Sequence, residues 1–284
     1  MKFIDAHSHI WTPDTKKYPL GPGYRRFNMD PPSFTAEELQ KEMKPVGVNR
    51  VVLIQMSFYG YDNSYMLDAI RRYPGSFSGV AVIDQDQPRV DLEMRKMKGQ
   101  GVRGFRIYPK NQTVEQWLDA PSMHTMWKTG GKEDLAMCCL IDADALPAID
   151  RMCRRYPDTT VVIDHISRIG VTGEIKPAEV KALTDLARHK NVHVKISAFY
   201  ALGKKKPPYH DLAGLIRQML DAYGPKRLMW ASDGPFQVVK GHTYKESIDL
   251  IKSGLDFLDD NDRRWLLTGT AERVFFKGFK NPAR

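Results

Sequence analysis

A chain of 284 residues, 42% apolar and 27% charged, has the size and composition of one large globular domain. No stretch approaches the ~20 consecutive apolar residues of a membrane span, and the first ten residues lead into a predicted strand instead of a signal peptide. The net charge of +9 comes from scattered lysines and arginines with one dense run at 204–206, so nucleic acid is not an expected partner.

The three cysteines argue against a disulfide framework. Cys138 and Cys139 are adjacent in a predicted strand, where successive side chains point in opposite directions, and Cys153 is the third. Free cysteines of this kind are typical of a reducing compartment. We therefore expect a cytoplasmic protein, and the sequence leaves open whether it forms a homo-oligomer.

Short apolar runs alternate with amphipathic stretches along the whole chain. The runs predict strands at 3–9, 50–55, 77–84, 102–108, 135–142, 160–165, 192–197 and 227–233. The amphipathic stretches predict helices at 35–47, 62–73, 89–98, 123–128, 145–156, 177–189, 209–223, 244–255 and from 260 to the C-terminus. Eight strand–helix units predict an α/β fold, a closed (β/α)8 TIM barrel in a single domain over residues 1–284. An open doubly wound sheet is the alternative, but no glycine-rich phosphate loop follows the first strand.

The polar segment 12–32 has no helical or strand period and is rich in Pro, Gly and Tyr. It is longer than a simple connector, so we expect a loop over an active-site mouth, with an ordinary surface excursion as the alternative. The helix that follows is predicted to begin at Thr35, which forms a capping box with Glu38.

In such a barrel the chemistry lies at the C-terminal ends of the strands. His7 and His9 end the first strand on one face, because residues two apart point the same way. His165 ends the sixth strand and Asp233 the eighth. Three imidazoles and a carboxylate can surround one divalent ion and leave it an open position. We therefore predict a metal site at His7, His9, His165 and Asp233, with a metal-free hydrogen-bonded cluster as the alternative.

The strand at 192–197 shows which of its faces is inside. Its apolar residues alternate with Lys195 and Ser197, and the apolar face must meet the outer helices. Lys195 and Ser197 then face the lumen. A buried lysine needs an anionic ligand or a carboxylate partner, so Lys195 either binds substrate or forms a structural pair with an aspartate.

Other strand ends also carry polar side chains suited to substrate. Arg106 ends the fourth strand, where a guanidinium can bind a carboxylate through two hydrogen bonds. Gln55 and Tyr108 end the second and fourth strands. We predict that Arg106, Gln55 and Tyr108, together with Lys195 and Ser197, bind an anionic small molecule.

Three short motifs, in their order along the chain, resemble the amidohydrolase superfamily. They are 5–9 (DAHSH), 164–165 (DH) and 231–235 (ASDGP), with further matches at 59–63, 194–197 and 270–273. More narrowly, the chain is similar to the amidohydrolase-2 family of metal-dependent hydrolases, and the likeness extends over essentially the whole chain. The resemblance implies an enzyme, either a lactonase or a non-oxidative decarboxylase of aromatic acids. The short chain and the Lys-x-Ser pattern look more like the lactonase branch.

The chain departs from that family at the end of the fifth strand. Many members of the superfamily place a histidine ligand there, whereas this chain has 138–142 (CCLID). The resemblance therefore leaves a metal-free site open, and Asp142 is an alternative ligand.

Together the residues and the resemblance predict a hydrolase that opens a lactone or related cyclic ester of an anionic molecule. Asp233 is the expected general base toward water, and His165 is the second catalytic candidate. The histidines would polarise the carbonyl through one divalent ion, with zinc as the first expectation, or through direct hydrogen bonds. The alternatives are a non-oxidative decarboxylase of an aromatic or unsaturated acid, and a non-catalytic binder.

Overall fold

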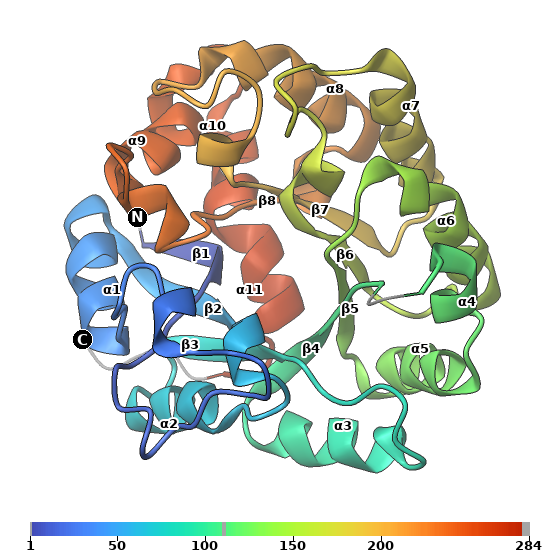
Figure 1. The fold of residues 1–284 in the computed structure, drawn as a ribbon. Coiled ribbons are helices and arrows are strands. Elements are labelled where there is room, and N and C mark those ends of the chain that lie inside the picture. Colours follow the sequence, from blue (N-terminus) through green and yellow to red (C-terminus); the bar gives the residue numbers. More distant parts are fainter. Residues whose placement is uncertain (1, 110–111, 280–284) are drawn as a thin grey trace.

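The computed structural model describes residues 2–109 and 112–279, whose strands form one parallel barrel (Figure 1). The strands are β1 (Phe3–Ser8), β2 (Val48–Ile54), β3 (Phe77–Ala81), β4 (Val102–Ile107), β5 (Ala136–Cys139), β6 (Val161–Ile163), β7 (Val192–Ile196) and β8 (Leu228–Trp230). They pair in chain order, each parallel to the next. A parallel bridge between Ser8 and Gly234 joins the first strand to the segment after the last. The predicted (β/α)8 barrel is confirmed.

Helices cover the outside of the strand ring. They are α1 (Ala36–Met43), α2 (Ser64–Arg72), α3 (Val90–Gly99), α4 (Val114–Leu118), α5 (Pro121–Glu133), α6 (Leu146–Arg155), α7 (Pro177–Asp185), α8 (Ala213–Tyr223), α9 (Tyr244–Asp249), α10 (Asp260–Arg264) and α11 (Thr270–Phe275). The predicted capping box is present, because the Glu38 N–H donates to Thr35 and the Thr35 N–H donates to Glu38. Among the described helices, none is both long and apolar enough to cross a bilayer.

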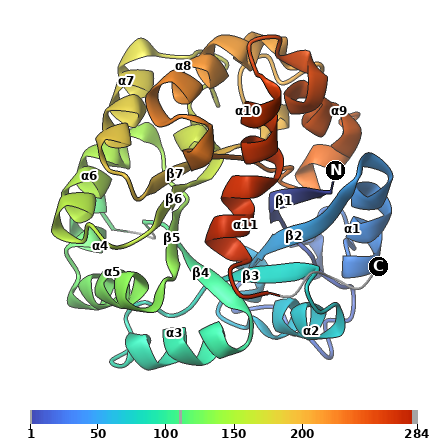
Figure 2. The same cartoon turned by 180° about the vertical axis from the view of Figure 1, so that it is seen from behind.

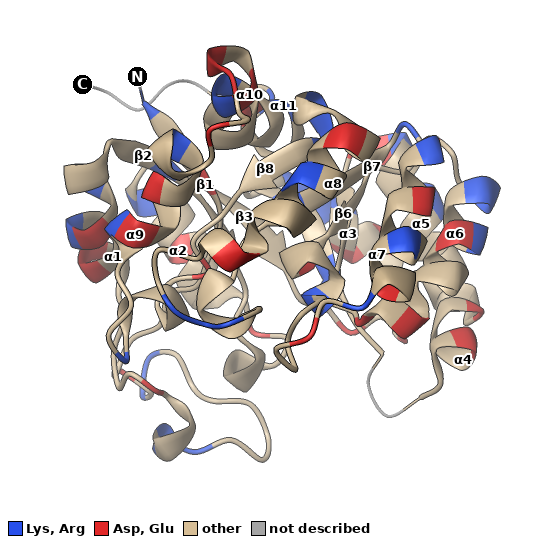
Figure 3. Cartoon of the chain, turned by 90° about the horizontal axis from the view of Figure 1, so that it is seen from above, with Lys and Arg blue, Asp and Glu red and all other residues tan. Residues whose placement is uncertain are grey.

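Charged side chains of both signs are interspersed along the outer helices (Figure 3). Many of them form ion pairs one helical turn apart, such as Lys181 with Asp185 and Arg95 with Asp91. All three cysteines are free and buried.

The alternation predicted for β7 is confirmed. Val192, Val194 and Ile196 pack in the cluster that joins the strands to the outer helices. Lys195 and Ser197 point the other way and are fully buried inside the barrel. Strand periodicity therefore decides which polar side chains enter the lumen.

The last helix, α11, crosses the N-terminal end of the barrel. Figure 2 shows it lying over the open end of the strand ring, opposite the face seen in Figure 1. Its last residue, Phe275, and the following Phe276 join apolar strand residues in a second core cluster that fills the lumen. The barrel is thus closed by side chains at this end, and ligands have access from the other.

Several strands end earlier than the sequence predicts. β5 and β8 stop three residues before their predicted ends at Asp142 and Asp233, and β6 stops two residues before its predicted end at His165. After β6 and β8 the chain turns because non-glycine residues adopt left-handed backbone angles, with φ of 53° at His165 and 63° at Asp233. Apolar patterning carries no sign of such turns, so it extends the strands too far.

The segment 12–32 packs beside the end of β2. The Thr12 N–H donates to the Tyr59 hydroxyl, and the Gly21 N–H donates to the Phe58 carbonyl. Figure 1 shows the segment as a dark-blue loop in front of β3 and α2. The structure describes all residues of this segment, and none of them lines the cavity at the C-terminal end of the barrel. The segment therefore fits the predicted surface loop better than the predicted loop over an active-site mouth.

Candidate active site

Three predicted ligands converge at the C-terminal end of the barrel. The Nε2 atoms of His7 and His9 lie 3.3 Å apart, and Asp233 Oδ1 lies 3.4 Å from each. His165 Nε2 is 3.9 Å from the same oxygen. The Asp233 oxygen is buried and accepts no hydrogen bond from the described residues, although three ring nitrogens face it.

The outer nitrogens of the rings are held by other groups. His9 Nδ1 lies 2.8 Å from the Ile54 carbonyl, which can only accept, so Nδ1 carries the proton and Nε2 keeps its lone pair. His165 Nδ1 lies 2.9 Å from the Ser197 hydroxyl. These contacts aim both Nε2 atoms at the centre of the site.

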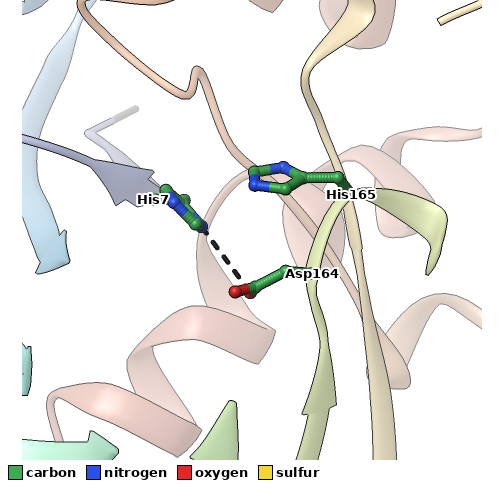
Figure 4. Close-up of side chains that lie close together, drawn as sticks. All are labelled: His7, Asp164 and His165. Carbon is green, nitrogen blue, oxygen red and sulfur yellow. Dashed lines mark ion pairs between the residues drawn. The ribbon is translucent and has the colours of Figure 1, made fainter. Parts of the chain in front are cut away.

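The turn that carries His165 is strained. Residues 165–168 have φ between 52° and 56°, a region that non-glycine residues rarely occupy and a β-branched Ile166 least of all. The turn brings the His165 ring to within 4.5 Å of the His7 ring, measured between centroids. Figure 4 shows both rings and the Asp164 carboxylate pointing into one space from β1 and the end of β6. The strained turn therefore places His165 in the site.

A fully buried ion pair lies beneath the imidazoles. Lys195 Nζ is 2.9 Å from Asp164 Oδ1 and 3.2 Å from His7 Nδ1. Arg106 lies on the other side, with one guanidinium nitrogen 3.4 Å from Asp164 Oδ2 and 3.1 Å from His7 Nε2. Burial alone would raise the pKa of Asp164, but Lys195 and the neighbouring charges hold it well below 3.8.

Protonation states follow from the same surroundings. Burial, and then the charge of Lys195, hold the pKa of His7 well below 6.5, and burial lowers the pKa of His165. Burial alone would raise the pKa of Asp233, but the imidazoles that face it prevail and hold it well below 3.8. Burial therefore favours unprotonated rings at His7 and His165, which keep the lone pairs that a cation requires.

A cavity of about 320 Å³ opens above this cluster. Its polar lining is His9, Arg106, His165, Arg168, Tyr200 and Asp233. Leu140 and Phe236 supply apolar walls. Such a volume suits a small molecule, and its two arginines suit an anionic one.

Four of the predicted substrate-binding residues lie elsewhere. Lys195 and Ser197 are fully buried beneath the histidines that they contact, and neither lines the cavity. The Gln55 amide donates to the Asp62 carbonyl at 2.6 Å. Tyr108 follows β4 and is also outside the described lining. Of the predicted substrate ligands, Arg106 is the one that reaches the cavity.

Two polar lining residues, Arg168 and Tyr200, were not predicted from the sequence, and of these Tyr200 contacts Asp233. Its hydroxyl donates to Asp233 Oδ2 at 2.7 Å. It lies three residues beyond Ser197, where Ala198 has a φ of 57° and turns the chain toward the cavity. An aromatic residue just past a strand end was the available signal, but its direction depends on that turn.

The model of the amidohydrolase family matches residues 4–277. The chain belongs to the amidohydrolase family. It is 30% identical over 279 residues to the 4-sulfomuconolactone hydrolase of Hydrogenophaga intermedia, a match that covers 95% of this chain and 88% of the relative. It is 27% identical over 245 residues to the L-fucono-1,5-lactonase of Burkholderia ambifaria, covering 84% of this chain and 82% of the relative.

Solved structures show the same barrel. An amidohydrolase of Burkholderia multivorans with bound zinc superposes with a TM-score of 0.81 at 22% identity, covering 97% of this chain and 99% of that one. The 2,6-dihydroxybenzoate decarboxylase of Rhizobium gives a TM-score of 0.70 at 14% identity, covering 98% and 99%. At these identities the likeness establishes the fold alone.

The donor set of this amidohydrolase fits a metal ion. Tetrahedral ligand atoms at about 2.0–2.1 Å from zinc lie roughly 3.3–3.4 Å from one another. The separations among His7 Nε2, His9 Nε2 and Asp233 Oδ1 are 3.3, 3.4 and 3.4 Å. His165 adds a fourth donor nearby.

The fifth strand contributes no ligand to this set. Leu140 lines the cavity near the position where the family resemblance led us to look for a histidine. Asp142 pairs with Arg168 at 3.2 Å, and its side chain is 57% exposed. Asp142 is therefore not brought to the cluster of His7, His9 and Asp233.

Proposed function

We propose that this amidohydrolase opens a lactone of a small anionic molecule by adding water to its carbonyl. The observation that carries the proposal is the buried Asp233 Oδ1, which has no hydrogen-bond donor and faces three imidazoles at the base of the cavity. A carboxylate in that position can take a proton from water beside a polarised carbonyl. Relatives that act on lactones support the substrate class.

Asp233 accepts a proton from the attacking water while the water oxygen forms a bond to the acyl carbon. The acyl carbon then releases the ring oxygen, and Asp233 returns the proton to it, which gives a hydroxy acid. One divalent ion, which we propose to be zinc, would be held by His7, His9 and Asp233, with His165, 3.9 Å from Asp233, as the fourth donor, and would polarise the carbonyl. Ser197 supports this step indirectly by holding His165, and Lys195 does so by holding Asp164, which faces His7 Nδ1 at 3.6 Å.

The anionic part of the substrate would meet the arginines of the cavity. Arg106 shares the His7 Nε2 lone pair, which cannot serve a guanidinium and a cation at once. Arg106 would then keep its contact with Asp164, and its remaining N–H groups would be available to the substrate. Arg168 lies nearer the mouth, where it pairs with Asp142. A carboxylate or sulfonate on the lactone would satisfy either arginine.

A panel of lactones with and without an acidic substituent tests the function. We expect proton release, read by a pH indicator, with acidic lactones as the preferred substrates. Elemental analysis of protein purified without added metal should find about one zinc per chain. A chelator should abolish turnover, and added zinc should restore it. Full turnover by metal-free protein would agree with the proposed hydrolysis but would contradict a role for the metal ion.

The same assay separates hydrolysis from decarboxylation. Carbon dioxide released from aromatic acids, with no proton release from any lactone, would replace our proposal with the decarboxylase. The likeness of this chain to the structural neighbours that carry that name establishes the fold alone.

We also propose a cytoplasmic location. Its support is that Cys138, Cys139 and Cys153 are all buried free thiols. Fractionation of the native cells with a compartment marker tests this, and recovery in an oxidising compartment would contradict it.

A further inference from the structure

The two oxygens of Asp233 have different surroundings. Oδ2 accepts a hydrogen bond of 2.7 Å from the Tyr200 hydroxyl. Oδ1 accepts none from the described residues and faces the imidazole nitrogens of His7, His9 and His165. Among the described residues, Tyr200 is thus the one hydrogen-bond donor to this carboxylate.

A carboxylate needs such a donor to keep one orientation. The terminal torsion of an aspartate is broad, so the plane of the group turns easily unless a partner fixes it. The Asp233 backbone is anchored, because its N–H donates to the His7 carbonyl at 2.8 Å and its φ is 63°. The backbone anchor fixes the position of the Asp233 Cα and Cβ atoms, and the Tyr200 hydroxyl fixes the orientation of the carboxylate plane.

The Tyr200 ring is itself held in place. It lies 6.3 Å from the Phe236 ring and 6.1 Å from the His242 ring, measured between centroids. Burial raises the pKa of Tyr200 above its ordinary value of 10, so the phenol keeps its proton. A neutral phenol in a fixed ring is a constant hydrogen-bond donor.

We propose that Tyr200 is a positioning residue that assigns separate roles to the two oxygens of Asp233. By occupying Oδ2, it turns Oδ1 toward the imidazoles and toward the water that Asp233 deprotonates. It also leaves Asp233 one oxygen, and not two, to offer a cation. This inference deepens the proposed hydrolase and rests on it for its catalytic consequence.

Kinetics of Tyr200→Phe test the catalytic consequence. A hydrogen bond to a charged group accounts for about a 10- to 100-fold effect, so kcat should fall by that factor while KM stays within about twofold. Tyr223→Phe is the matched control, because it also removes a buried hydroxyl, which donates to the Leu183 carbonyl at 2.6 Å, but it touches neither Asp233 nor the residues around Tyr200. Its kcat should remain that of the parent. A raised KM with unchanged kcat would make Tyr200 a substrate contact and overturn the proposal.

Crystal structures of the parent and of Tyr200→Phe give a second readout that requires no activity. We expect the Asp233 carboxylate to be turned in the variant, with Oδ1 no longer facing the imidazoles, whereas His9 and His165 keep their places. An unchanged carboxylate would overturn the positioning role. If neither protein opens any lactone, the proposed function fails, and the orientation of Asp233 still decides the role of Tyr200.

Discussion

At its C-terminal end the barrel lumen holds ionisable side chains of β1, β4, β6 and β7, among them His7, Arg106, Asp164 and Lys195. At its N-terminal end it holds apolar side chains and is closed by Phe275 of α11 and by the following Phe276. The two regions meet where Lys195 Nζ lies 5.5 Å from the centre of the Phe275 ring. The comparison shows that the two ends of one lumen have different roles. Buried charges at the C-terminal end require partners, whereas apolar packing at the N-terminal end stabilises the fold.

Removing the general base should have the largest effect on kcat and should leave the stability of the apolar end unchanged. Asp233→Asn keeps the shape of the side chain but cannot accept the proton, so kcat should fall by about 10²–10⁴-fold or more. Steady-state kinetics measure this, and circular dichroism should show a retained fold. Unchanged turnover would remove Asp233 from the mechanism.

Breaking the buried ion pair should affect both activity and stability. Lys195→Met leaves the Asp164 carboxylate without its 2.9 Å partner, and such a loss lowers the free energy of unfolding by about 3–5 kcal/mol. Urea denaturation measures it. The double variant with Asp164→Asn is the control, because removing both charges should recover part of the loss. Purely additive effects would show that the pair is not coupled.

Opening a hole at the apolar end should affect stability alone. Phe275 is fully buried, and Phe275→Ala should lower the free energy of unfolding by about 3–5 kcal/mol through lost burial and a cavity. The kcat of the folded fraction should stay near that of the parent. Phe275→Leu, which keeps more of the volume, should lose less. A large drop in kcat for Phe275→Ala would mean that the two ends are not separate.

A titration at the closed end should have the smallest effect at neutral pH, because it develops only as the pH falls below 6.5. Burial, followed by the charge of Arg273, lowers the pKa of His193 to about 4 from 6.5. Between pH 6.5 and 4 the unfolded chain binds a proton that the folded chain does not, so the free energy of unfolding falls as pH falls, by about 1.4 kcal/mol per pH unit. His193→Asn should reduce that slope, measured by urea denaturation at several pH values. The exposed His210→Asn is the control, and equal slopes in parent and His193→Asn would refute the assignment.

Local sequence pattern was sufficient wherever one strand or helix decides the outcome. Period-two alternation placed Lys195 and Ser197 inside the barrel, and apolar runs located every strand. The position of His7, His9, His165 and Asp233 at strand ends placed them at one mouth, because the C-terminal ends of parallel strands meet there. These features depend on backbone geometry that repeats along the chain.

Only the tertiary structure decided which of those side chains contact one another. Lys195 pairs with Asp164 instead of reaching the cavity, and Tyr200 turns back to Asp233, because the left-handed turns after β6 and β7 redirect the chain. Non-glycine residues enter that conformation against their local preference, and packing around them supplies the compensating energy. Sequence therefore determined the barrel and the residues around its mouth, whereas side-chain partners from distant strands became fixed only when the barrel closed.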